Sequence, residues 1–204
     1  MNGKRTSMLV SICLTAVLAV SPAVGFAQGT TTFSGEAIGL KASVVGISLD
    51  LSDTGALPSS GGNLSTSLAT VNVAGIAAAN ALSSSTSGSG SSSQSQSTLL
   101  DVNLLNGLVT ATVVKSNSSA TCSGSQASVS GNAQLVGLTV AGQSILASNP
   151  NLSISLPGGI SVIINQQTSS SGGNAGSITV NALHVTGPSI DIVVGSAQSG
   201  ITCS

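Results

Sequence analysis

The feature that most constrains this chain is a two-residue alternation of apolar and polar side chains. It recurs in short runs at 45–51, 152–156, 160–164 and 190–194. Because successive side chains of a β-strand point to opposite faces, each run predicts a strand with one buried face. Helical spacing is sustained nowhere after the first 27 residues. We therefore expect an all-β fold.

Turn-forming residues separate the runs, and their glycines can adopt positive φ without a steric penalty. The expected turns are Asp53-Thr54-Gly55, 58–62, Asn106-Gly107, Ala141-Gly142, 157–159, 172–174 and Gly187-Pro188. Many short strands joined in this way favour an antiparallel β-sandwich. A faint echo of the segment 71–75 at 102–107, 138–142 and 180–183 leaves a β-solenoid as the alternative, although its spacing drifts from about 31 to about 42 residues.

The N-terminus has the layout of a cleavable signal peptide. A basic pair, Lys4 and Arg5, precedes an apolar run from Met8 to Val20, and small residues at Gly25 and Ala27 suit signal peptidase. The run is shorter than the roughly 20 residues that a membrane-spanning helix needs. We predict a signal peptide at 1–27, one Ser/Gly-rich β-domain at 28–204, and no transmembrane span after cleavage.

Cleavage leaves a chain that is poor in aromatic and charged side chains. Phe33 becomes the one aromatic residue, so Val, Ile, Leu and Ala must fill the core, and small side chains would let two sheets approach closely. Loss of Lys4 and Arg5 leaves two basic against five acidic residues, a net charge of −3. Nucleic-acid binding needs several basic residues and stacking platforms, so we expect none. By composition, 83–97 is either a flexible linker or a solvated hairpin.

Two cysteines remain in the exported chain, Cys122 and Cys203, because Cys13 leaves with the signal peptide. An even pair in an oxidising compartment predicts a disulfide. Closing a loop of roughly 80 residues restricts the unfolded chain by about 4 kcal/mol in the chain-entropy model. A zinc site is the weaker alternative, since His184 would have to join two distant thiolates without an evident fourth ligand.

The candidates for chemistry are sparse. His184 and Asp191 could form a hydrolase triad with one of the many serines, but there is no Gly-x-Ser-x-Gly motif and His184 lies in a strand-like run, where a part-buried, hydrogen-bonded histidine is expected. Asp50, Ser52 and Asp53 before Gly55 resemble part of a calcium loop without its bidentate glutamate, which favours a plain hairpin turn. We predict no enzymatic activity and no cofactor.

Three segments resemble the bacterial exported proteins called the choice-of-anchor P family: Phe33-Ser34-Gly35-Glu36-Ala37, the segment 104–111 leading to Cys122, and Gly176 to Val185 followed by Ile201-Thr202-Cys203. The resemblance implies export and independently implies the pairing of Cys122 with Cys203. It carries no catalytic residues. Only Ser204 follows Cys203, without a sorting signal, so we expect release or non-covalent association with the envelope.

These observations favour a secreted or cell-surface-associated, non-catalytic structural or interaction module. Its expected partners are components of the cell envelope or the extracellular matrix, and it would lie outside the cell or in the periplasm. The alternative is an ice- or glycan-binding β-protein, because flat Ser/Thr-rich sheets can bind ordered water or sugars. Ice binding usually requires ranks of Thr-x-Thr, and only Thr110-Ala111-Thr112 has that pattern.

Overall fold

The structure is a computed structural model that describes residues 30–146 and 149–204; the predicted signal peptide and Cys13 lie outside this part. The described residues contain strands and turns but no helix, and hence none long and apolar enough to cross a membrane. The strands are β1 (Thr32–Val44), β2 (Ile47–Asp53), β3 (Gly62–Val73), β4 (Ala77–Ser89), β5 (Ser92–Leu104), β6 (Val109–Ser123), β7 (Gln126–Val136), β8 (Thr139–Val140), β9 (Gln143–Ser144), β10 (Leu152–Leu156), β11 (Ile160–Gly172), β12 (Ala175–Gly187) and β13 (Ile190–Thr202).

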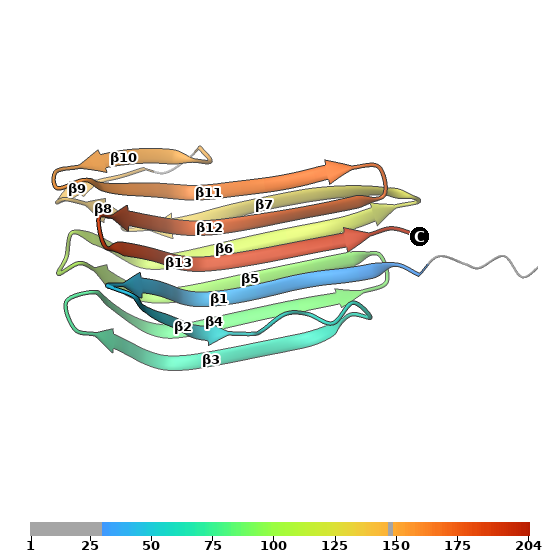
Figure 1. The fold of residues 1–204 in the computed structure, drawn as a ribbon, viewed down its shortest axis with the longest axis horizontal. Coiled ribbons are helices and arrows are strands. Elements are labelled where there is room, and N and C mark those ends of the chain that lie inside the picture. Colours follow the sequence, from blue (N-terminus) through green and yellow to red (C-terminus); the bar gives the residue numbers. More distant parts are fainter. Residues whose placement is uncertain (1–29, 147–148) are drawn as a thin grey trace, which may run out of the picture.

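The strands form two packed antiparallel sheets (Figure 1). Sheet A has the order β10-β11-β12-β13-β1-β2, and sheet B has the order β3-β4-β5-β6-β8-β9 with β7 also paired to β6. The chain begins in sheet A, builds all of sheet B, and returns to sheet A, where β13 pairs with β1. The predicted antiparallel sandwich is confirmed, and the solenoid alternative is wrong because every pairing is antiparallel.

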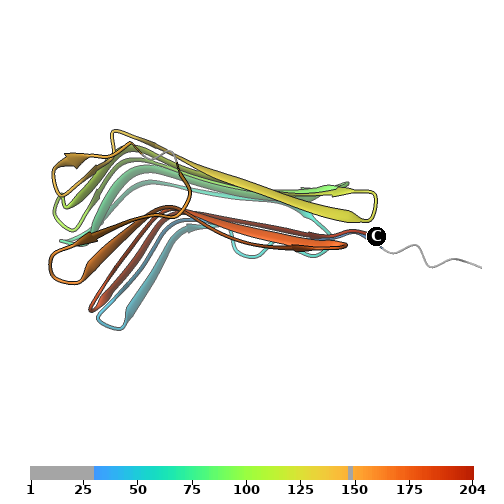
Figure 2. The ribbon, with the colours of Figure 1, turned by 90° about the horizontal axis from the view of Figure 1, so that it is seen from above.

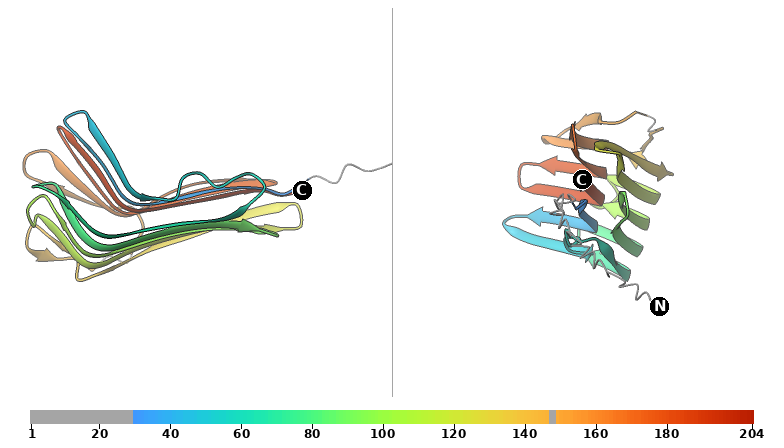
Figure 3. Two further views of the ribbon diagram at one scale, coloured as in Figure 1. Left: turned by 90° about the horizontal axis from the view of Figure 1, so that it is seen from below. Right: turned by 90° about the vertical axis from the view of Figure 1, so that its right-hand side faces the viewer.

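Both sheets bend sharply along one line that crosses their strands (Figures 2 and 3). By register, Ser52, Gly195 and Asn165 lie in one row across sheet A and have positive φ, and in sheet B Ala81 and Asp101 are likewise neighbours with positive φ. In sheet A the ladders omit one residue on each strand there and keep their register, whereas the β4–β5 ladder shifts its register on both sides of Asn80, as at a β-bulge. Bulges bend the strands that carry them. The line divides the molecule into a bent end, which holds the β1–β2 and β12–β13 turns, and a straight end, which holds the C-terminus.

The interior changes character along the strands. At the bent end it is a large aliphatic cluster whose fully buried members include Leu40, Leu104 and Ile192. At the straight end it is a small cluster around Phe33 and Cys203. Between them lies a layer of buried hydroxyl side chains, which we call the serine layer: Ser84, Thr86, Ser93, Ser95, Ser97, Ser116, Ser118 and Ser199.

The serine layer is held by hydrogen bonds between the two sheets. The Ser118 and Ser199 hydroxyls lie 2.8 Å apart, and Ser93 Oγ donates to the Ser34 carbonyl at 2.7 Å. Cα atoms of β13 lie within 8 Å of those of β5 and β6, closer than the about 10 Å usual between packed sheets. Gly35 permits this approach, because a Cβ there would collide with Thr86 Oγ1. Small residues therefore bring the sheets together, as predicted.

The segment 83–97 is neither a linker nor a fully solvated hairpin. It forms most of the β4–β5 hairpin, with Ser84, Thr86 and Ser95 buried and the intervening side chains facing outward. Its alternation is therefore the same signal that marks the apolar strands, with serine in the buried positions.

The predicted disulfide is present at the straight end. Cys122 in β6 and Cys203 after β13 are bonded across the two sheets, with Cα atoms 5.6 Å apart. The Cys203 backbone N–H also donates to the Asn174 carbonyl at 2.7 Å. The C-terminal segment is thus tied to sheet B by a covalent bond and to the β11–β12 turn by a hydrogen bond.

The alternation at 45–51 predicted a strand whose apolar face is buried throughout, and this is wrong for its first half. Val45 and Gly46 form the β1–β2 turn, so Val45 is 79% exposed and Ile47 is 74% exposed. Leu49 and Leu51 are half-buried. These side chains are exposed because the turn projects at the bent end of the molecule (Figure 3).

Candidate functional site

The outer surface of sheet B carries a regular array of polar side chains, all but one of them uncharged. We call it the polar face. The register aligns its residues across β4, β5, β6 and β7 in three ranks: Ser83-Thr98-Lys115-Gln134, Ser85-Gln96-Asn117-Asn132 and Ser87-Gln94-Ser119-Ser130. All are exposed or half-buried. Neighbouring strands are about 4.8 Å apart, so each rank presents a polar group at that interval.

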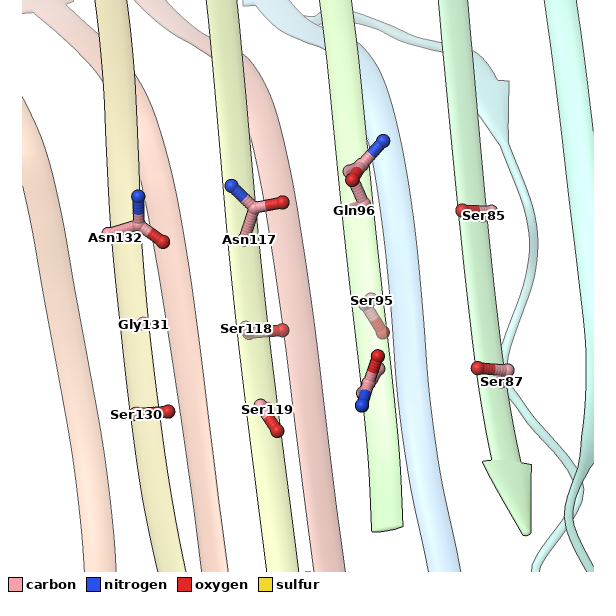
Figure 4. A pocket seen from close by; sticks show the side chains of 11 residues that line it. Ser85, Ser87, Ser95, Gln96, Asn117, Ser118, Ser119, Ser130, Gly131 and Asn132 are labelled. Carbon is pink, nitrogen blue, oxygen red and sulfur yellow. The ribbon is translucent and has the colours of Figure 1, made fainter.

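A shallow open hollow of about 400 Å³ lies over the second and third ranks. Figure 4 shows its lining side chains, with the amides of Gln96, Asn117 and Asn132 along one row and the hydroxyls of Ser119 and Ser130 along the next. Drug-sized ligands usually occupy enclosed, mainly apolar pockets. An open polar hollow on a flat sheet is better suited to part of an extended polar surface or polymer.

Many donors and acceptors of the polar face are not used within the protein. Among the described residues, Gln94 Nε2 donates to Ser92 Oγ at 3.3 Å, whereas the side chains of Gln96, Asn117 and Asn132 make no such hydrogen bond. Each amide carries both donor and acceptor groups. These side chains can therefore bond a ligand that itself offers both kinds of group, such as a hydroxyl.

Charge is segregated between the two sheets. Lys115 is the one charged side chain in the three ranks, and sheet B otherwise carries Asp101 at the bend. Glu36, Lys41, Asp50, Asp53 and Asp191 all belong to sheet A. The polar face is thus almost neutral, and long-range attraction to ionic partners would be weak there.

His184 and Asp191 are brought together, as a triad would require, but no serine joins them. Nε2 of His184 lies 3.0 Å from Asp191 Oδ1, and Nδ1 lies 3.0 Å from Gln166 Oε1, which also accepts from Asn181 Nδ2 at 2.8 Å. The histidine side chain is 18% exposed, on the outer side of sheet A. Both ring nitrogens are occupied by an amide and a carboxylate, so the arrangement holds the ring rather than activating a hydroxyl.

The proposed calcium-loop residues do not form a loop. Asp50 and Ser52 lie within β2, where a plain hairpin turn was expected, and the positive φ of Ser52 interrupts the strand between Asp50 and Asp53, which are both exposed. Asp53 Oδ1 accepts a hydrogen bond from the Gly55 N–H at 2.7 Å, which begins the following turn. In residues 30–146 and 149–204, no three His, Cys, Asp or Glu side chains gather as metal ligands do.

Glu36 lies near these carboxylates on sheet A. Partial burial raises the pKa of Glu36, and the negative charge of Asp53 raises it further; Lys41 opposes the shift and Asp50 adds a smaller rise. The ionised form of Glu36 is therefore disfavoured in the folded protein. The shift therefore bears on the pH dependence of stability.

The threonines considered for ice binding do not lie on a flat rank. Thr112 lies opposite Asp101 at the interruption of the β5–β6 ladder, and Thr110 Oγ1 is 2.7 Å from Thr139 Oγ1. The polar face itself mixes short hydroxyls with long amides. Its geometry therefore gives less support to an ice-binding surface than to a sugar-binding one.

The polar face was not recognised from the sequence. The signal that could have found it is the Ser/Gln alternation at 92–97, continued as Lys-x-Asn-x-Ser in β6 and Ser-x-Asn-x-Gln in β7. Reading those segments as paired strands would have placed the polar residues on one face. No family model, no curated protein and no solved structure matches this chain.

Proposed function

We propose that this protein is an exported, non-catalytic interaction module that binds neutral, hydroxyl-rich polymer through the polar face of sheet B. The observation that carries this proposal is the set of three aligned ranks of hydroxyl and amide side chains around an open hollow, with one charge among them. A neutral polysaccharide of the envelope or the extracellular matrix has matching chemistry, because it offers many hydroxyls and no charge.

The energetics favour a polymer over a single sugar. A hydrogen bond formed at an exposed site replaces one with water, so its net contribution is only about 0.5 to 1.5 kcal/mol. Useful affinity then requires several bonds made at once along a repeating chain. The face also lacks the aromatic platforms that hold single sugars, since Phe33 is buried in the interior. Repetition in the protein is thus matched by repetition in the ligand.

Export is the second part of the proposal. It is supported by the signal-peptide pattern at 1–27, by the resemblance to exported choice-of-anchor P proteins, and by the disulfide between Cys122 and Cys203, which suits an oxidising compartment. Mass mapping of the protein recovered outside the cytoplasm is expected to find Gln28 at its N-terminus. An intact N-terminus beginning at Met1, found in the membrane fraction alone, would contradict export.

Binding is tested by affinity electrophoresis in gels that contain a neutral β-glucan, a mannan or a galactan. At least one gel should retard the protein, and added salt should not abolish the effect, because no ion pairs are involved. The double variant Gln96→Ala/Asn117→Ala should bind roughly tenfold more weakly, the loss expected for about two net hydrogen bonds. Gln198→Ala, an exposed glutamine on the outer side of sheet A, is the matched control and should bind normally.

The following results would contradict the proposed binding of a neutral polymer by the polar face. If the protein binds a charged polysaccharide at low salt and none of the neutral ones, the proposed ligand class is wrong. If the Gln198→Ala control weakens binding as much as the double variant, the polar face is not the binding surface. Ice recrystallisation assays give the alternative its test, with inhibition unaffected by neutral polysaccharide as the result that would replace this proposal.

A further inference from the structure

The outer edge of sheet B is an open strand. β3 is twelve residues long and forms the edge of sheet B. It lies beyond β2 of sheet A, at the lower margin of Figure 1. Within the described part of the chain, no backbone group pairs with its free side, although the Thr66 carbonyl accepts a hydrogen bond from Ser52 Oγ at 3.4 Å. At about 3.3 Å per residue, it presents an edge of roughly 40 Å. Its sequence, Gly-Asn-Leu-Ser-Thr-Ser-Leu-Ala-Thr-Val-Asn-Val, has no charge and no proline.

The other long edges of the sandwich are protected against pairing. At β7, the Ala127 N–H donates to the Gly173 carbonyl at 3.0 Å and the Ala133 N–H donates to Asn165 Oδ1 at 3.1 Å. β2 carries two aspartates, and β10 has only five residues. Soluble proteins use such covers, charges and short strands to prevent edge pairing. β3 is long and uncharged, and among the described residues one side-chain hydrogen bond reaches its backbone, from Ser52 Oγ to the Thr66 carbonyl at 3.4 Å, which leaves the second lone pair of that oxygen free.

The sequence of β3 is self-complementary in an antiparallel pairing centred on Thr66. Residue i would then lie opposite residue 132 − i of the second strand, so Leu64 faces Leu68 and Ser65 faces Ser67, each twice by symmetry. Leu64, Thr66 and Leu68 share the inward side, since their partners on β4 are Thr86, Ser84 and Leu82. Leu68 is 38% exposed and Leu64 is half-buried, so the pairing would cover apolar surface that β3 alone leaves in water.

The outward side of β3 continues the polar face. Asn63, Ser65 and Ser67 pair with Ser87, Ser85 and Ser83, the first members of the three ranks. In this pairing Ser67 and Ser65 face each other across the join, so the first and second ranks would continue into the second copy without a charge between them, whereas Asn63 would face Ala69. A different protein would need side chains selected for this strand, whereas a second copy already supplies the complementary register.

We propose that two copies of this protein pair through β3 in an antiparallel, two-fold symmetric arrangement centred on Thr66, which joins the two B sheets into one. The same surface serves both partners, as in other two-fold interfaces. The proposal does not depend on the ligand of the polar face, because it rests on the edge of the sheet and not on its surface.

Sedimentation velocity of the exported protein over a wide range of concentrations tests the assembly. A concentration-dependent monomer–dimer equilibrium is expected. Leu68→Lys should weaken dimerisation at least tenfold, because it places two lysines next to leucines at the join. Val136→Lys is the matched control, since Val136 is 46% exposed near the opposite edge, and it should leave the equilibrium unchanged. A protein that stays monomeric at every concentration, or a dimer that Leu68→Lys leaves intact, overturns the proposal.

Cysteine cross-linking tests the register without relying on a destabilised variant. Thr66→Cys lies on the two-fold axis, so oxidation should convert it to a disulfide-linked dimer. Thr70→Cys would face position 62 of the second copy, far from its own equivalent, and should remain largely unlinked. Equal cross-linking of the two variants, or none with Thr66→Cys, would show that the strands do not pair in this register.

Discussion

Ser116 and Ser199 lie in the same serine layer and both are fully buried, but their hydroxyls differ in hydrogen bonding. Ser199 Oγ is 2.8 Å from Ser118 Oγ and 3.2 Å from the Ser118 carbonyl oxygen. Ser116 Oγ has no partner among the described residues. Changing each serine to alanine removes one oxygen atom from a buried site, so the two variants isolate the contribution of the hydrogen bonds.

We expect opposite effects on the free energy of unfolding. Ser199→Ala leaves Ser118 Oγ without its bonded hydroxyl, at a cost of about 1 to 3 kcal/mol. Ser116→Ala removes a hydroxyl that is already desolvated without compensation, so it should be neutral or stabilise the protein by about 1 kcal/mol. The two variants should therefore differ by about 1 to 4 kcal/mol.

Urea unfolding followed by far-ultraviolet circular dichroism measures this difference, because the chain contains no Trp or Tyr for fluorescence. The free energy of unfolding should fall with urea concentration at the same slope in all variants, which would show that they expose the same amount of surface on unfolding. Ser119→Ala, on the polar face, is the control for loss of a hydroxyl outside the interior. Equal destabilisation by Ser116→Ala and Ser199→Ala would refute the argument, since burial and not hydrogen bonding would then decide the cost.

Three other predictions concern stability. The double variant Cys122→Ser/Cys203→Ser should lower the free energy of unfolding by about 2 to 5 kcal/mol, because the disulfide spans 81 residues; two titratable thiols in the unreduced, unfolded wild type would contradict this. The pKa of Glu36 is raised in the folded state, so its contribution to stability falls as pH rises from the ordinary glutamate pKa through the raised one. Glu36→Gln should therefore stabilise the protein at neutral pH, and its urea midpoint should vary less with pH across that range. An unchanged pH dependence of the midpoint would assign the effect to other groups such as Asp53. Val45 has φ of 48° in an exposed turn, a conformation that asparagine tolerates better, so Val45→Asn should raise the melting temperature by a few degrees, and a lower one would show that the valine side chain stabilises the turn.

The alternation of side chains was enough to predict most of the strands, because it records which face is buried. The runs at 152–156, 160–164 and 190–194 became β10 and parts of β11 and β13. Where the pattern failed, at Val45 and Ile47, the reason was long-range. Whether an apolar strand face is covered depends on how far the opposite sheet extends, which a local pattern does not contain.

The serine layer could not be recognised from composition, because serine is typical of solvent-exposed linkers. Its hydroxyls are buried only because Gly35 and other small residues let the sheets approach and supply partners for them. The polar face was missed for the same reason: its ranks exist only when four strands are set in register. The pair His184 and Asp191 was foreseen as a possibility, yet Gln166, which occupies the second ring nitrogen, comes from a neighbouring strand and was given no role.

The row of positive-φ residues across each sheet also bears on how such a repetitive sequence reaches one alignment. Strands rich in serine carry little information about their pairing, because sliding one of them by two residues again places a small polar side chain opposite another. The bulges at Ala81 and Asp101 interrupt this degeneracy on β4 and β5, since each must meet the bends of its neighbours. A strand slipped by two residues would carry its bend out of line and break the ladder on both sides. The residues at the bend thus fix the register of the strands, so that a low-complexity chain selects a single native pairing.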